Sequence, residues 1–105
     1  VEFAKGRFPQ VAGITFTYEA KQPFGSRIQS ILVNGQVLQA TKQYVLATTD
    51  YLVQGGDGYT TLSMTQNKSI TTQDTPLLSD IVIRAIQTKQ RIAPKVEGRI
   101  VRIDK

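Results

Sequence analysis

Residues 28–38 of this chain are IQSILVNGQVL, two apolar-rich runs on either side of Asn34-Gly35. Asn-Gly is the strongest short signal for a β-hairpin, because a type I′ turn needs two successive residues with positive φ. The sequence therefore predicts a hairpin whose strands are residues 28–33 and 37–38.

Three further segments are predicted as strands. In residues 14–19, ITFTYE, apolar and polar residues alternate with the period of a half-buried strand. Residues 44–53, YVLATTDYLV, are apolar on both faces at their start, which predicts a central strand covered on both sides. Residues 99–103 form the last predicted strand, and residues 21–26, with one proline and one glycine, form a predicted turn.

A helical pattern follows residue 74. Asp74-Thr75-Pro76 predicts a helix start, with an oxygen-bearing cap and a proline at the first helical position. Pro94 cannot continue the helix. The residues of one broad apolar face, which we expect to lie in the core, are Leu77, Leu78, Ile81, Val82, Ala85 and Ile86. The polar residues 65–72 are expected to form a surface loop.

The order of these elements predicts an α+β fold: a mixed β-sheet with the Asn-Gly hairpin, one long amphipathic helix and a closing C-terminal strand. At 105 residues, the chain is long enough for one hydrophobic core, and residues 1–105 are expected to be a single domain.

Composition excludes several classes of function. The chain has no cysteine and no histidine, so thiol nucleophiles, the usual catalytic triads and most zinc or di-metal centres are excluded within it. We therefore expect no catalytic residue and no metal ligand here. The net charge is +5, and the basic residues are scattered along the sequence rather than interleaved with aromatic residues. We therefore expect no nucleic-acid polymer as a partner. No apolar run approaches the roughly 20 residues of a membrane span, and no signal peptide is recognisable.

Residues 50–59, DYLVQGGDGY, hold the candidate site. Three glycines in four residues indicate a backbone that needs positive φ or a close approach, and Asp57 lies between them. An aromatic face, a loop carboxylate and bare backbone amides can hold a base and a ribose. A tight turn can use the same residues for its conformation alone, and Gly55 and Gly56 are interpreted as mainly conformational.

Three segments together resemble the C-terminal domain of the 5′-nucleotidase / UDP-sugar hydrolase family. They are GRFPQVAG at residues 6–13, DYL with GGDGY at residues 50–59, and PKVEGRI at residues 94–100. Their order and spacing agree with the family, so the resemblance covers nearly the whole chain and implies that domain's fold.

The resemblance implies that Phe8 and Tyr51 sandwich the base and that Asp57 accepts hydrogen bonds from the ribose, with Gly55 and Gly56 beside them. Many family members have phenylalanine where Tyr51 stands. In the family, two divalent metal ions (zinc, manganese or magnesium) in an N-terminal metallophosphoesterase domain do the phosphate chemistry. The chain begins just before the first motif, so we expect the domain's upstream part, with its arginines and an asparagine, to be missing. This chain alone is expected to be inactive.

The implied partners are a nucleotide or nucleoside and the protein's own catalytic domain, and the implied location is periplasmic, extracellular or cell-surface. Alternatives stay open at this point. Phe8 can be a core residue, Asp57 can serve only its turn, and the chain can be a small non-enzymatic α+β ligand-binding or interaction module. Nucleoside monophosphates, cyclic phosphodiesters and UDP-sugars are all open as substrates.

Overall fold

The computed structural model describes residues 6–64 and 76–105, which fall into two units. The first unit comprises Val1–Val45 and Val96–Lys105, and the second comprises Leu46–Lys95. The strands lie in the first unit and the helices in the second, so the α+β class is confirmed.

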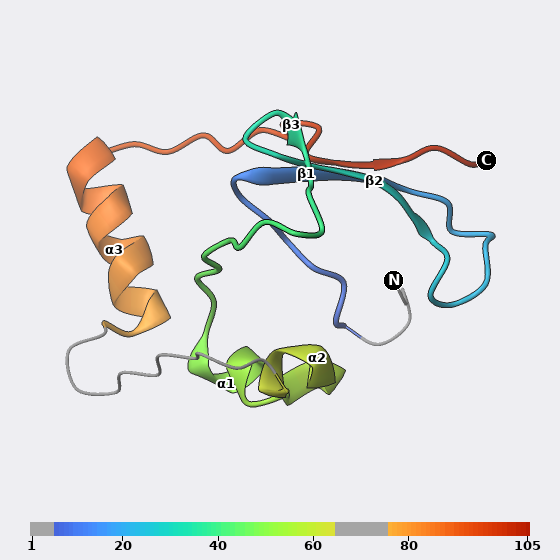
Figure 1. The fold of residues 1–105 in the computed structure, drawn as a ribbon. Helices are drawn as coiled ribbons and strands as arrows, with labels where there is room; N and C mark the ends of the chain where they lie inside the picture. Colours follow the sequence, from blue (N-terminus) through green and yellow to red (C-terminus); the bar gives the residue numbers. More distant parts are fainter. Residues whose placement is uncertain (1–5, 65–75) are drawn as a thin grey trace. The chain divides into compact units, whose positions relative to one another are not determined.

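The sheet of the first unit has four strands in the order β3-β2-β1-β4. These are β1 (Ile14–Tyr18), β2 (Ile28–Val33), β3 (Gln36–Val37) and β4 (Ile100–Arg102). β2 pairs antiparallel with both β1 and β3, whereas β1 and β4 run parallel, with the C-terminal strand (red) beside β1 in Figure 1. The predicted mixed sheet is confirmed.

The Asn-Gly hairpin forms as predicted. Asn34 has φ 50° and Gly35 has φ 80°, the pair of positive values that a type I′ turn requires. The strand β3 ends at Val37, but the Leu38 N–H still donates to the Ile31 carbonyl at 3.1 Å. The local turn chemistry therefore sets the register of this side of the sheet.

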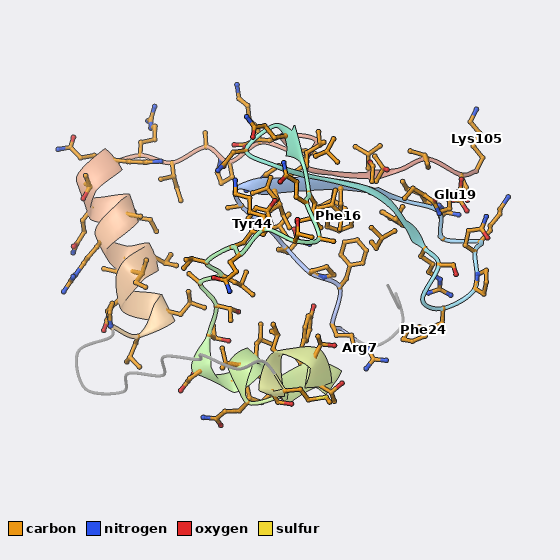
Figure 2. The ribbon with its side chains drawn as sticks, in the orientation of Figure 1. Arg7, Phe16, Glu19, Phe24, Tyr44 and Lys105 are labelled. Carbon is orange, nitrogen blue, oxygen red and sulfur yellow. The ribbon has the colours of Figure 1, made fainter. Side chains whose placement is uncertain are left out.

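The core of the first unit lies on one face of β1. Phe16 is 6% exposed and Tyr18 is 8% exposed, and their ring centroids lie 6.3 Å apart. Figure 2 shows Phe16 among the side chains that gather beside β1. On the opposite face, the hydroxyls of Thr17 and Ser30 form a 2.7 Å hydrogen bond. This confirms the alternation predicted from the sequence.

Asp104 ties the C-terminal segment to the turn that follows β1. Its carboxylate accepts the backbone N–H groups of Ala20 at 3.0 Å and Lys21 at 2.7 Å, and the Nε of Arg102 at 2.8 Å. The hydrogen bond from Arg102, supported by the two backbone N–H groups, lowers the pKa of Asp104 from 3.8 to about 2.

We expect Asp104→Asn to destabilise the protein at neutral pH. Because the pKa of Asp104 is lower in the folded state, its contribution is present above pH 3.8 and is lost as the pH falls toward about 2. Urea unfolding of the full-length protein between pH 7 and pH 2 measures this, with the exposed Asp80→Asn as the matched control. Identical pH dependence in the Asp104 variant and the parent protein would contradict this assignment.

The central strand predicted over residues 44–53 is wrong. Residues 43–49 have no regular structure, and Asp50–Val53 form the short helix α1. The Oγ1 of Thr49 accepts the Leu52 N–H at 3.4 Å and caps the helix start. Gly55, with φ 95°, then donates its N–H to the Leu52 carbonyl at 3.0 Å and ends the helix.

The predicted amphipathic helix is confirmed as α3 (Leu78–Lys89), but its start differs. The N-cap is Leu77, whose ψ of 148° keeps the chain extended, so Pro76 lies before the cap and not at the first helical position. Asp74 and Thr75, and the loop predicted over residues 65–72, lie outside the described residues.

The prediction that one face of α3 lies in the core is also wrong. No residue of α3 is buried, and the large apolar side chains of its predicted core face are 39–70% exposed. These exposed residues are Leu77, Leu78, Ile81, Val82 and Ile86. Helical periodicity predicts an apolar face correctly, but within its own unit no described element covers that face.

Over residues 6–64 and 76–105, no helix is long and apolar enough to cross a membrane.

Candidate functional site

The candidate site lies in the second unit, where α1, the 3₁₀ turn η1 (Gly56–Gly58) and α2 (Thr60–Ser63) follow one another. These elements form the green and yellow segment of Figure 1. Tyr51 stands in the first turn of α1 and is 59% exposed. The capped helix start therefore presents an aromatic ring to solvent.

The Gly-rich turn takes the left-handed backbone that its composition predicts. Gly55, Asp57 and Gly58 have φ values of 95°, 54° and 81°. Aspartate is one of the few residues with a side chain that tolerate this region, which explains an acid between glycines. The conformational role predicted for Gly55 is confirmed.

Gly56 has a different role, because the position that a side chain would occupy faces the ring of Tyr51. A Cβ on Gly56 would lie 2.5 Å from Cε1 and 2.6 Å from Cζ of that ring, and 2.6 Å from the Tyr51 carbonyl oxygen. The bare backbone of Gly56 is therefore the surface on which the Tyr51 ring rests.

Tyr51 and Asp57 meet across this turn. The Tyr51 hydroxyl donates to Oδ1 of Asp57 at 3.2 Å, and both residues are exposed. The distance exceeds the usual 2.7–2.8 Å of an O–H···O bond, so a ligand hydroxyl can compete for this oxygen. The site thus combines one aromatic ring with one solvent-facing carboxylate, which is an acceptor only when ionised.

Phe8 belongs to the first unit, so the structure groups Tyr51, Gly55, Gly56 and Asp57 without it. The Phe8 ring packs edge-on against Tyr18, with 5.7 Å between centroids and 66° between ring planes. Such a ring contact is expected if Phe8 is a core residue. Base stacking by Phe8 stays a prediction.

The sequence analysis missed two contributors to the site. Thr49 caps the helix that carries Tyr51, and a Thr-Asp pair before an apolar run is the signal that could have shown it. Gly56 was interpreted as mainly conformational, and no sequence signal shows its contact with the ring of Tyr51. Among the described residues, no three histidine, cysteine, aspartate or glutamate side chains gather to hold a metal ion.

The model of the family described as "5'-nucleotidase, C-terminal domain" matches residues 2–64. The chain is 32% identical over 107 residues to the 5′-nucleotidase of Diplobatis ommata, covering 94% of the chain and 18% of that protein. It is 32% identical over 108 residues to the trifunctional nucleotide phosphoesterase protein YfkN of Bacillus subtilis, covering 95% of the chain and 7% of that protein.

A snake venom 5′-nucleotidase from Macrovipera lebetinus is 31% identical over 107 residues, covering 94% of the chain and 26% of that protein. The chain thus spans between 7% and 26% of the length of these relatives. No solved structure matches the chain significantly. The match of the family model over more than half of the sequence identifies the chain as a member of the 5′-nucleotidase C-terminal domain family.

Proposed function

We propose that this chain is part of the substrate-recognition domain of a 5′-nucleotidase-like phosphohydrolase, and that residues 1–105 form a single domain. The observation that carries the proposal is the arrangement of Tyr51, whose ring rests on Gly56 and whose hydroxyl contacts Asp57. It lies within the region that matches the family model. The proposed ligand is the nucleoside part of a nucleotide.

In this proposal, a base stacks on the free face of Tyr51. Stacking on an aromatic ring contributes about 1–3 kcal/mol and tolerates different bases, because every base has a π-face. The carboxylate of Asp57 accepts hydrogen bonds from the ribose hydroxyls and repels a phosphate. Phosphate recognition and cleavage are therefore assigned to another part of the protein.

The catalytic partner in this proposal is an N-terminal domain with two divalent metal ions, which would supply an activated water for phosphate-ester hydrolysis. The described residues of this chain do not fit such a metal centre, since they contain no cluster of ligand-type side chains. The names of the relatives, two 5′-nucleotidases and a nucleotide phosphoesterase, support a nucleotide as the substrate.

We also propose that the protein acts outside the cytoplasm, in the periplasm, at the cell surface or extracellularly. The support is the venom 5′-nucleotidase among the relatives.

The test is phosphate release from adenosine monophosphate by the full-length protein. We expect release in the presence of zinc, manganese or magnesium, its loss on chelation, and no release by residues 1–105 alone. Activity of residues 1–105 alone would contradict the assignment of the chemistry to another domain. Absence of release by the full-length protein with every divalent metal would overturn the enzyme proposal in favour of a non-enzymatic binding module.

A further inference from the structure

We propose that the hydroxyl of Tyr51 makes this site accept 2′-deoxyribonucleosides nearly as well as ribonucleosides. The inference rests on the proposed function, because it takes Asp57 as the acceptor for the sugar. It concerns the sugar selectivity of the site and the residue that sets it.

The first step is that the Tyr51 hydroxyl is held near Asp57 by the backbone. The hydrogen bond from the Leu52 N–H to Thr49 fixes the helix start that carries Tyr51. Gly56 lies against the ring edge at Cε1 and Cζ, the side next to the hydroxyl. The ring therefore rests on the same turn that carries the carboxylate of Asp57.

The second step concerns how many oxygens Asp57 offers to a sugar. A ribose diol presents two donors, at the 2′ and 3′ positions, and pairs best with both oxygens of one carboxylate. Oδ1 already accepts the Tyr51 hydroxyl at 3.2 Å, so a ribose must share or displace that contact. A 2′-deoxyribose presents one donor on this side and needs only Oδ2.

The third step is the size of the effect. Because the Tyr51–Asp57 contact is long, a ribose can displace it at modest cost, and the expected change in selectivity is about two- to tenfold. Phenylalanine at position 51 would keep the stacking ring and leave both oxygens of Asp57 to the diol. In this proposal, the Tyr51 hydroxyl is therefore the group that lowers the preference for ribose.

The experiment is calorimetric titration of the full-length protein with adenosine and with 2′-deoxyadenosine. For the parent protein, we expect the two dissociation constants to differ by less than about tenfold. Tyr51→Phe is expected to raise the preference for adenosine about two- to tenfold, through tighter binding of adenosine. Tyr44→Phe removes a phenol hydroxyl in the first unit and is the matched control, with the preference expected to stay unchanged.

An unchanged or reduced preference for adenosine in Tyr51→Phe would overturn this inference. Asp57→Ala separates that failure from failure of the proposed function. If Asp57→Ala weakens adenosine binding while Tyr51→Phe leaves the preference unchanged, only the inference about the hydroxyl is wrong. If Asp57→Ala leaves adenosine binding unchanged, Asp57 is not the sugar acceptor. The inference about the hydroxyl and the proposed function are then both wrong.

Discussion

Replacing Tyr51 by alanine in the full-length protein is expected to weaken adenosine binding about 5- to 150-fold. This range corresponds to the about 1–3 kcal/mol that stacking of one base on an aromatic ring contributes. Tyr51 is 59% exposed, so we expect its replacement to weaken binding without unfolding the chain. Isothermal titration gives the affinity, and thermal unfolding of the same samples tests the fold.

Phe8→Ala decides whether a second ring takes part. If Phe8 and Tyr51 sandwich the base, both variants lose affinity by a similar factor. If the contact of Phe8 with Tyr18 is its whole role, Phe8→Ala lowers the melting temperature and leaves the affinity unchanged. Phe24→Ala, at a phenylalanine that is 71% exposed, is the control for ring removal. Unchanged affinity in both the Phe8 and Tyr51 variants would remove the stacking assignment altogether.

The sheet could be predicted from the sequence because its signals are local. The Asn34-Gly35 turn fixes the hairpin through two φ values, and the alternation in residues 14–19 places Phe16 and Tyr18 on one face. What the sequence did not specify is that β4 would pair parallel with β1, since that depends on the path of the whole chain between them.

The wrong predictions for residues 44–53 and for the burial of the apolar face of α3 have physical reasons. A short apolar run such as residues 44–53 fits a buried strand or a helix equally well by periodicity. The Thr49 cap and the Gly55 stop limit the helix to residues 50–53, and residues 43–49 have no regular structure. The apolar face of α3 was predicted correctly as a face, but its burial depends on a covering element, and helical spacing carries no information about that element.

The residue types of the site could be predicted, but their arrangement could not. The sequence pointed to Tyr51 and Asp57 separately, as a ring and a carboxylate. Their hydrogen bond depends on a helix at residues 50–53 and a left-handed backbone at Asp57, and the first of these was predicted as a strand. The contact of Gly56 with the ring follows from the same arrangement.

Gly56→Ala is expected to destabilise the site by about 1–3 kcal/mol, the usual cost of overpacking. The new methyl would lie 2.5 Å from Cε1 of Tyr51 and 2.6 Å from the Tyr51 carbonyl oxygen. A ring can swing away, but a helical backbone oxygen cannot move without disturbing α1. We therefore expect both a lower melting temperature and weaker adenosine binding in the full-length protein.

Gly25→Ala is the control, because it separates backbone strain from contact with the ring. Gly25 has φ 89° and nothing within 4 Å of an added Cβ, so alanine there is strained without touching any neighbour. Gly56 is the opposite case, since it has no positive φ and the atoms nearest to an added Cβ belong to Tyr51. We expect Gly25→Ala to lower the melting temperature and to leave adenosine binding intact. If Gly56→Ala instead lowers both the melting temperature and the affinity for adenosine, Gly56 acts as the support of the ring. Normal adenosine affinity in Gly56→Ala would show that the ring does not need this support in order to bind.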